Sequence, residues 1–344
     1  MSSVLVADLR AKAPVWRLSD EGARRLVAAA PEGWSVRIVE APTISDGDGG
    51  TPPSDDAMKA VADAEAYVGF GMSRDLFLAA PRLRWIHSAA AGVGGLLFPE
   101  LRSSGVIVTN SAGVHAEPIA EHVLGGILHF VRAHDVASEL QRRHEWAREP
   151  FVGAHSPVRE LSEYRALILG AGGIGRAIAR KLAALGVACV GVRRRPELGT
   201  PAGFTRVVGA DAWEALVPES DLLVISAPAT PATHRLVTAP VLDRLPHGAI
   251  VVNVARGSLL DEAALAERIA GGAIRGAVLD VFEREPLPAE SPLWELPSVL
   301  LTPHVSAVSP HRFWERELSL VIDNWRRLAS GAGLRNVVDV GQGY

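Results

Sequence analysis

The chain has 344 residues, of which 48% are hydrophobic, and its formal net charge is −4. A chain of this length exceeds one ordinary hydrophobic core, so we expect two domains. The weakly acidic balance excludes a global basic surface for nucleic acid. The single cysteine, Cys189, excludes an intramolecular disulfide and a multi-cysteine zinc site, and we expect no bound metal.

The sequence carries no signal for a membrane or for export. No apolar stretch reaches the ~18 residues that a membrane helix needs. The first ten residues lack a basic region followed by an apolar core, so no signal peptide is predicted. We therefore expect a cytoplasmic protein without a membrane partner.

The first third of the chain alternates short apolar runs with helix-length segments, which predicts parallel βαβ units. The stretch 41–56 is rich in Gly, Pro, Ser and Asp, and this composition predicts an exposed loop. The predicted strands of this part are residues 4–7, 36–39, 66–70, 85–88 and 106–109.

A long helix is predicted next, because Pro118 suits a first helical turn and apolar residues then recur at helical spacing. It should run to about residue 135 and be followed by a polar, basic segment that contains Trp146. A second doubly wound sheet and a last helix, residues 309–328, should follow, and that helix is expected to return to the first domain. The strands predicted for the second sheet are residues 166–169, 187–192, 221–226, 249–253, 277–280 and 299–302.

A glycine-rich turn follows the first strand of the second sheet, where Gly170, Gly172 and Gly175 match G-x-G-x-x-G. The first glycine allows a tight turn, the second lets the backbone approach a pyrophosphate, and the third allows close contact between helix and strand. Amides at the helix start, including those of Gly173 and Ile174, would face a diphosphate. A purely structural turn is the alternative, but the strand-turn-helix context favours dinucleotide binding.

Three arginines, Arg193, Arg194 and Arg195, follow the next predicted strand. A site for NAD usually carries Asp or Glu near this point, to bond the ribose hydroxyls. A guanidinium at Arg193 would instead bind a 2′-phosphate. The sequence therefore predicts a preference for NADP(H) over NAD(H), against the alternative of a solvated basic loop.

Three polar residues, Arg256, Glu285 and His304, follow three consecutive predicted strands of the same sheet. Parallel strands place their carboxyl ends at one edge, where such folds hold ligands. A guanidinium can bond the carboxylate and the ketone oxygen of a 2-oxo acid, and an imidazole can donate a proton near neutral pH. A carboxylate beside the imidazole stabilises its charged form. The trio predicts hydride chemistry on a small 2-oxo acid, whereas each residue alone would be unremarkable.

With these motifs, the chain resembles the D-isomer-specific 2-hydroxyacid dehydrogenase family, and in its arginines the NADP-preferring glyoxylate and hydroxypyruvate reductases. The resemblance covers most of the chain. The matching stretches are residues 83–93, 106–121, 170–175, 226–233, 251–262, 276–288 and 301–306.

The resemblance implies two α/β domains with doubly wound parallel sheets. A discontinuous, flavodoxin-like substrate domain would comprise residues 1–117 and 307–344, and a Rossmann cofactor domain residues 118–306. It also implies roles for individual residues. Arg256 would bind and polarise the substrate, His304 would be the acid/base with Glu285 as its partner, and the amides of Ala91 and Gly92 would bind the substrate carboxylate. The nicotinamide half of the cofactor would be lined by Ala227, Pro228, Asn253, Val254, Ala255 and Asp280.

The function expected from this resemblance is NAD(P)H-dependent, reversible reduction of a small 2-oxo acid to a D-2-hydroxy acid, by a homodimer. In family dimers the segment after the long helix reaches the other subunit, and Trp146 would fit there; packing within its own domain is the alternative. A dinucleotide-sensing protein of the corepressor type, with little or no turnover, is the other function considered. Formate dehydrogenase is disfavoured, since it would place Gln at the position of Glu285. Glyoxylate, hydroxypyruvate and phenylpyruvate-like acids all stay open as substrates.

Overall fold

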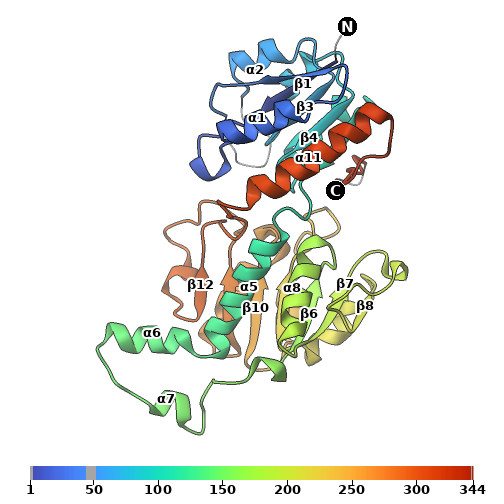
Figure 1. Ribbon diagram of the computed structural model, residues 1–344. Helices are drawn as coiled ribbons and strands as arrows, with labels where there is room; N and C mark the ends of the chain where they lie inside the picture. The colour runs from blue at the N-terminus through green and yellow to red at the C-terminus, as the bar shows by residue number, and fades with distance from the viewer. Residues whose placement is uncertain (1–2, 44–51, 342, 344) are drawn as a thin grey trace. The chain divides into compact units, whose positions relative to one another are not determined.

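The computed structural model describes residues 3–43, 52–341 and 343 (Figure 1). The chain divides into two compact units, the first made of Met1–His115 with Val308–Tyr344 and the second of Ala116–Ala307. Each unit is a parallel α/β layer structure, as predicted. Residues 44–51 of the predicted loop lie outside the described residues, while Ser54 caps the helix that follows.

The first unit is built on a five-stranded parallel sheet with the order β2-β1-β3-β4-β5. This is the strand order of flavodoxin-like folds. The helix α11 returns from the end of the chain and packs with α1 on one face of this sheet. The strands are β1 (Ser3–Asp8), β2 (Trp34–Ile38), β3 (Ala66–Gly69), β4 (Trp85–Ser88) and β5 (Ile107–Asn110). The helices are α1 (Asp20–Ala28), α2 (Asp55–Ala60), α3 (Arg74–Leu78), α4 (Pro99–Arg102) and α11 (Phe313–Ser330), with 3-10 turns η1 (Pro14–Trp16) and η2 (Gly94–Leu96).

The two faces of this sheet bury different residues because side chains alternate along each strand. Leu5 and Ala7 join Phe313 and Trp325 in the core under α11. Val4 and Val6 face the opposite layer with α2, α3 and α4. The long aromatic residues of α11 therefore complete a core that begins with the first strand.

The second unit is built on a seven-stranded parallel sheet with the order β12-β11-β10-β9-β6-β7-β8. This is a Rossmann order, in which the strand sequence reverses between β9 and β6. The strands are β6 (Arg165–Leu169), β7 (Ala188–Val192), β8 (Arg206–Val208), β9 (Leu222–Ile225), β10 (Ala249–Asn253), β11 (Ile274–Leu279) and β12 (Val299–Leu301). The helices are α5 (Ala116–Val131), α6 (His134–Arg142), α7 (Glu149–Val152), α8 (Gly173–Ala184), α9 (Ala239–Leu242) and α10 (Glu262–Ala270). The 3-10 turns are η3 (Leu161–Glu163), η4 (Pro196–Leu198), η5 (Trp213–Glu219), η6 (Gly257–Leu259) and η7 (Pro292–Glu295).

Helices α5 and α8 lie side by side on one face of this sheet (Figure 1). Small residues allow the close approach of α5, since a Cβ on Gly126 would lie 2.7 Å from the Val278 side chain. Cys189 belongs to the same core, and burial raises the pKa of its thiol to about 12. The thiol is therefore a packing group.

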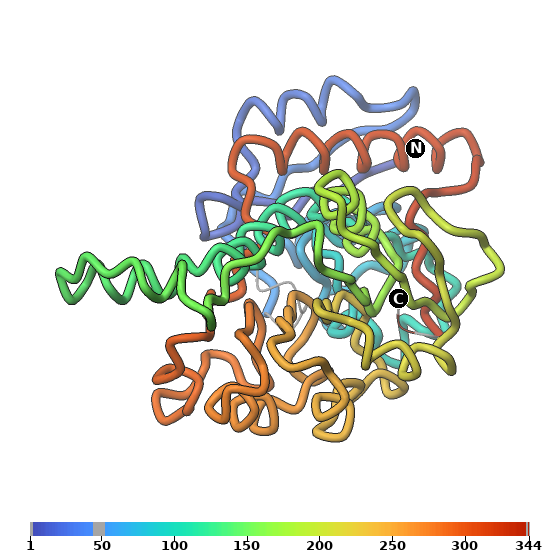
Figure 2. The backbone as a smooth tube through the Cα atoms, turned by 90° about the horizontal axis from the view of Figure 1, so that it is seen from below, coloured from blue at the N-terminus to red at the C-terminus, as the bar shows by residue number. Residues whose placement is uncertain are grey.

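The long helix α5 ends earlier than predicted. It stops at Val131 instead of residue 135, because Ala133 adopts a left-handed conformation with φ of 55°. Asp135 then pairs with Arg275 through two contacts of 2.7 Å, which fixes the direction of the next segment. That segment is α6, which was predicted only as a polar stretch, and it projects away from the sheet of its unit (Figures 1 and 2).

Other differences from the predicted elements are small. The short edge strand β8 was missed, and α11 begins at Phe313 instead of residue 309. Among residues 3–43, 52–341 and 343, no helix has the length and apolar character needed to cross a membrane.

Candidate active site

The predicted functional residues of the second unit lie along one edge of its sheet. They follow β12, β11, β10, β9, β6 and β7, which are consecutive neighbours in the sheet. Since the strands are parallel, all of these loops leave at the carboxyl edge, and the reversal between β9 and β6 marks its ligand crevice. In the order of the sheet, the residues are His304, then Asp280 and Glu285, then Asn253–Arg256, then Ala227 and Pro228, then Gly170–Gly175, then Arg193–Arg195.

The glycine turn after β6 has the tight geometry that its sequence predicts. Gly170 has a φ of +110°, and a Cβ there would lie 2.6 Å from the carbonyl oxygen of Ser226. A Cβ on Gly175 would lie 1.9 Å from the carbonyl oxygen of Gly170. These two positions need glycine for the fold itself, because side chains would collide with backbone.

Gly172 differs from these two glycines, because a Cβ there would meet nothing within 4 Å. It is the N-cap of α8 and provides no side-chain cap to the first turn of that helix. The amides of the first turn, which include those of Gly173 and Ile174, are thus suited to an anionic ligand. This open backbone fits the diphosphate of a dinucleotide.

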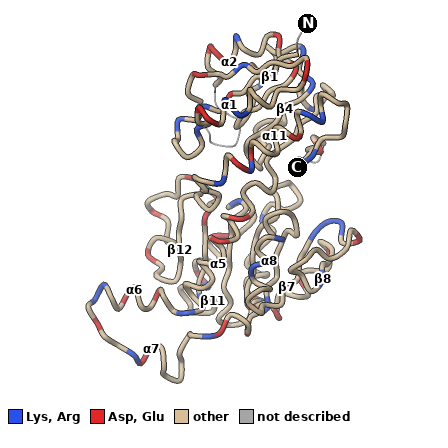
Figure 3. Tube along the Cα trace, in the orientation of Figure 1, with Lys and Arg blue, Asp and Glu red and all other residues tan. Residues whose placement is uncertain are grey.

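Basic residues gather in the loop after β7 (Figure 3). Arg193 Nη2 donates to the carbonyl oxygen of Gly199 over 2.6 Å, while its Nε is buried without a hydrogen-bond partner among the described residues. Arg194 and Arg195 are exposed. A buried guanidinium nitrogen without an acceptor is a suitable donor for a phosphate, so the residues fit a phosphorylated ribose.

The turn that carries Arg256 is organised by Asn253 at the end of β10. The Asn253 side chain is fully buried, donates to the carbonyl oxygen of Arg256 over 3.0 Å and accepts from the Ala255 amide over 3.1 Å. Arg256 Nη1 bonds the carbonyl oxygen of Ala255 over 2.8 Å. The Asn253 side chain therefore fixes the turn that carries Arg256.

A close backbone contact brings the loops after β10 and β11 together. A Cβ on Gly257 would lie 1.8 Å from the carbonyl carbon of Phe282, so only glycine fits beside Arg256. The Phe282 amide in turn donates to Glu285 Oε1 over 3.0 Å. This bond orients the Glu285 carboxylate.

The imidazole of His304 meets that carboxylate. His304 Nδ1 lies 2.9 Å from Glu285 Oε2, and the two side chains are 43% and 36% exposed. The structure therefore brings together two residues that are 19 positions apart in sequence and follow different strands. The pair is half open to solvent, as a group that exchanges protons with a ligand requires.

Asp280 holds the loop that carries His304. Its carboxylate is fully buried and accepts from Thr302 Oγ1 over 2.6 Å and from the amides of Val305 and Ser306 over 2.9 Å each. Its carbonyl oxygen accepts from the His304 amide over 2.9 Å. The Asp280 side chain thus serves this loop, although the sequence predicted it as a cofactor contact.

Sequence reasoning missed Thr302, His122 and Glu262. Thr302 Oγ1 joins Asp280 to His122 Nε2, which lies 3.3 Å away on α5. Glu262 accepts from the Glu283 amide, and burial, with smaller effects from the charges of Glu283 and Glu285, raises its pKa. Of these three residues, only Thr302 had a signal in the sequence, because it lies two residues before the candidate proton donor His304.

Comparison with known protein families decides the family of this chain. The family model for the NAD binding domain of D-isomer specific 2-hydroxyacid dehydrogenases matches residues 124–306, more than half of the chain. The chain belongs to this family. The match spans the sheet edge described above, including the glycine turn, Arg256, Glu285 and His304.

Relatives of this chain differ in length. The glyoxylate/hydroxypyruvate reductase B of Pectobacterium carotovorum is 32% identical over 81% of this chain and 87% of its own length. The D-3-phosphoglycerate dehydrogenase of Mycobacterium tuberculosis is 31% identical over 96% of this chain. The chain spans only 60% of the length of that mycobacterial enzyme.

Solved structures of the family match along the whole chain. A D-isomer specific 2-hydroxyacid dehydrogenase from Xanthobacter autotrophicus, solved with NADPH, has a TM-score of 0.80 at 30% identity and full coverage of both chains. An NADPH-dependent glyoxylate/hydroxypyruvate reductase from Sinorhizobium meliloti, solved with NADP, has a TM-score of 0.78 at 28% identity, again with full coverage.

Two predicted substrate contacts, Ala91 and Gly92, belong to the first unit, in the loop after β4. The Ala91 carbonyl oxygen accepts from Asn110 Nδ2 over 2.7 Å. Among the described residues, no group of three or more His, Cys, Asp or Glu side chains could hold a metal ion.

Proposed function

We propose that this family member catalyses the reversible, nicotinamide-dependent reduction of a small 2-oxo acid to a D-2-hydroxy acid. The observation that carries the proposal is the 2.9 Å pair of His304 and Glu285 at the ligand edge of the sheet, with the Arg256 loop packed against the Glu285 loop. The reductase names of the relatives support the same reaction class.

The proton is assigned to His304. With Nδ1 bonded to Glu285, Nε2 is the ring nitrogen that would donate to the ketone oxygen of the substrate. The Glu285 carboxylate stabilises the imidazolium before transfer and keeps the ring oriented. When bound, the reduced nicotinamide supplies the hydride. In the reverse direction the same nitrogen accepts the proton of the hydroxyl group.

Arg256 is assigned to the substrate. Its planar guanidinium can bond a carboxylate oxygen and the ketone oxygen together, which fixes the substrate and polarises the carbonyl group. We assign the amides of Ala91 and Gly92 to the same carboxylate. The first unit would then be the substrate domain and the second unit the cofactor domain.

The cofactor is proposed to be NADP(H) in preference to NAD(H). Gly170–Gly175 would hold the diphosphate, and the arginine loop after β7 would hold the 2′-phosphate. The NADPH and NADP in two related structures support this preference. Ala227, Pro228, Val254 and Ala255 would line the nicotinamide side, together with Asn253 and Asp280.

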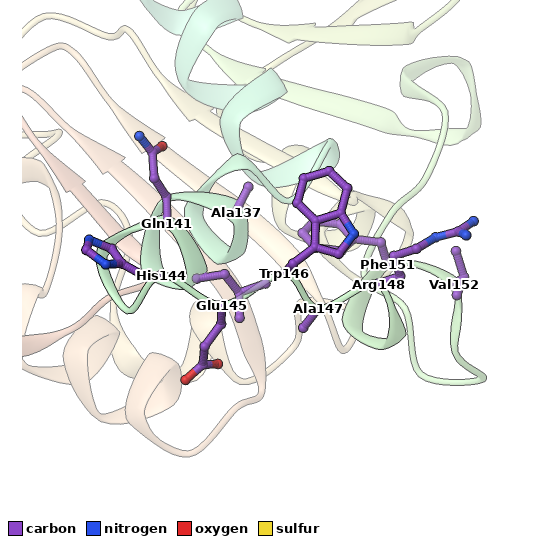
Figure 4. Close-up of a pocket in the computed structure, with 10 residues that line it drawn as sticks. Ala137, Gln141, His144, Glu145, Trp146, Ala147, Arg148, Phe151 and Val152 are labelled. Atoms are coloured by element: carbon purple, nitrogen blue, oxygen red, sulfur yellow. The ribbon is translucent and has the colours of Figure 1, made fainter.

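The assembly is proposed to be a homodimer that uses the arm formed by α6 and α7, residues 134–152. Trp146 is 95% exposed and Val152 is 69% exposed, so Trp146 does not pack within its own unit. Both border a hollow of about 610 Å³ whose lining includes Ala137, Leu140 and Phe151 (Figure 4). An exposed apolar surface of this kind is typical of a protein interface, and a second copy of the chain is the proposed partner.

The dimer is tested by measuring the molar mass of Trp146→Asp by light scattering after gel filtration. Its matched control is Trp294→Asp, which changes a tryptophan that is 53% exposed outside the arm. We expect a dimer for the control and a monomer for Trp146→Asp. Equal masses for the two variants would contradict the assignment of the arm.

The reaction is tested by following absorbance of the reduced nicotinamide, with NADPH and NADH separately, across a panel of 2-oxo acids. Faster oxidation of NADPH with one preferred acid supports the reaction and the cofactor together. Turnover with NADH alone would be consistent with His304 as the proton donor and would contradict the assignment of Arg193 to the 2′-phosphate. Cofactor binding without turnover on any acid would favour a dinucleotide-sensing protein.

A further inference from the structure

A buried polar network in the first unit ties the C-terminal helix α11 to the ends of β4 and β5. His87, Ser111 and Glu317 are all fully buried, and Glu317 lies 230 positions from His87 in sequence. His87 Nε2 is 3.0 Å from Glu317 Oε1, and Ser111 Oγ donates to Glu317 Oε2 over 2.7 Å. The other ring nitrogen, His87 Nδ1, lies 2.8 Å from Thr109 Oγ1.

Joining a helix to a sheet through a buried polar network is less favourable in free energy than joining them through apolar contacts. Burying these groups costs free energy that their mutual hydrogen bonds only offset, and apolar residues of similar size often stabilise a fold as well or better. Around the network, α11 already packs through Phe313, Val321 and Trp325. What the polar contacts add to this packing is a fixed position for the backbone segment that they bond.

The network holds the loop after β4. Ser111 Oγ is 2.9 Å from the carbonyl oxygen of Ser88, and the Ser111 amide donates to the carbonyl oxygen of Ala90 over 3.1 Å. The neighbouring Asn110 donates from Nδ2 to the carbonyl oxygen of Ala91 over 2.7 Å. Two carbonyl groups of this short loop, those of Ala90 and Ala91, therefore accept hydrogen bonds from two adjacent residues, and one of these residues, Ser111, is bonded to Glu317 through its hydroxyl group.

The same loop leaves two donors available. Within residues 3–43, 52–341 and 343, the amides of Ala91 and Gly92 donate no hydrogen bond, and both residues are partly exposed. Adjacent amides without acceptors, on a loop whose carbonyl groups are held, form a site for an anion such as a carboxylate. Their positions depend on the bonds that hold the carbonyl groups of Ala90 and Ala91.

We propose that Glu317, His87 and Ser111 are positioning residues for this carboxylate site. They fix the loop 88–92 so that the amides of Ala91 and Gly92 are preorganised for the substrate. Identification of the anion as the carboxylate of a 2-oxo acid rests on the proposed function. The fixing of the loop rests on the hydrogen bonds alone.

The test compares Ser111→Ala and Glu317→Met with Glu317→Gln, which keeps one acceptor oxygen and puts an amide donor in place of the other. The control is Tyr67→Phe, which removes a buried 3.0 Å bond to Asp8 on the other face of the same sheet. Three quantities are measured in each variant: amide hydrogen exchange of residues 88–93, the KM for the 2-oxo acid and the Kd for the cofactor.

We expect Ser111→Ala and Glu317→Met to speed exchange in residues 88–93 and to raise KM roughly tenfold, since one buried bond is worth about that factor. The cofactor Kd should not change, and Glu317→Gln should recover most of the wild-type KM. Tyr67→Phe should lower thermal stability without changing KM or exchange in this loop.

The proposal is overturned if exchange and KM in the network variants match those of Tyr67→Phe. If Glu317→Met does not fold, Ser111→Ala decides the question, because it removes a single hydroxyl group. If the wild-type protein reduces no 2-oxo acid, the proposed function fails, and exchange in residues 88–93 still decides whether the network holds the loop.

Discussion

Two acceptor groups of Asp280 hold the backbone at His304 by hydrogen bonds. Its carbonyl oxygen takes the His304 amide, and its carboxylate takes the amide of the next residue, Val305, both over 2.9 Å. His304 has a φ of 53°, a left-handed conformation that a residue with a side chain adopts at a cost. The buried carboxylate offsets that cost, and the imidazole is thereby directed to Glu285.

Replacement of His304 by Ala should remove most turnover and leave cofactor binding intact. General acid–base catalysis contributes about 10²- to 10⁴-fold, so we expect kcat to fall by that factor. His247 is the matched control, because it is exposed and precedes β10 at the opposite edge of the sheet. Near-normal turnover of His304→Ala in a stopped-flow assay would falsify the proton-donor assignment.

Replacement of Arg256 by Ala should raise KM for the 2-oxo acid and lower kcat together. The guanidinium is proposed to bind both the ground state and the transition state, so kcat/KM should fall about 100-fold or more. Arg256→Lys should recover little, because an ammonium group lacks the planar pair of donors. Steady-state kinetics decide the point, with Arg244→Ala as a control, and an unchanged KM would contradict the role.

Two alanine substitutions in the glycine turn should separate folding from binding. Gly175→Ala places a Cβ against the carbonyl oxygen of Gly170, so we expect about 1–3 kcal/mol of destabilisation. Gly172→Ala enters open space, so its melting temperature should match that of the wild type. Calorimetric titration should nevertheless show at least tenfold weaker NADP binding for Gly172→Ala. Wild-type affinity in that variant would exclude the diphosphate from this turn.

Arg193→Ala should lower the preference for NADPH over NADH by about tenfold or more, the range expected for one charged hydrogen bond. The effect should lie in the KM for NADPH, since NADH has no 2′-phosphate. The control is Arg206→Ala, an exposed arginine at the start of the neighbouring strand β8. A variant that loses affinity for both cofactors equally would show that Arg193 only supports its loop through Gly199.

Asp8→Asn should stabilise the protein in a pH-dependent way. Burial raises the pKa of Asp8, and the hydrogen bond from Tyr67 only partly opposes this. The contribution of the wild-type Asp8 to the free energy of unfolding is therefore fully present below the usual carboxyl pKa of about 3.9. It is lost as the pH rises through the higher pKa that Asp8 has in the folded protein. Melting curves should show the gain of Asp8→Asn at neutral pH and its disappearance in acid. A constant gain across pH, or the same gain in Glu290→Gln at an exposed site, contradicts the assignment.

The sheets and the edge that carries the site were predictable because the responsible signals are local. Buried parallel strands read as apolar runs, and the order of such runs with the glycine turn places Arg256, Glu285 and His304 at one edge. The contact of Gly257 with Phe282 and the bonds of Asp280 were not predictable, since they depend on loop conformations. The residue types alone do not fix those conformations.

The other misses share a physical cause. The left-handed turn at Ala133 has no glycine to signal it, and Arg275, which holds Asp135 after the turn, is 140 positions away. The network of His87 and Glu317 spans an even longer separation. Pairs of this kind become visible only when the chain returns to a sheet that it left much earlier.

That return has a consequence for synthesis of the protein on the ribosome. The second unit is one continuous segment and can fold as soon as residue 307 has emerged, whereas the first unit waits for α11 to supply Phe313 and Trp325. Until then, only α1 covers this apolar face of the five-stranded sheet, and Ser111 lacks its buried carboxylate partner. The portion of the chain made first is therefore the portion completed last, and the nascent chain needs protection from aggregation over most of its translation.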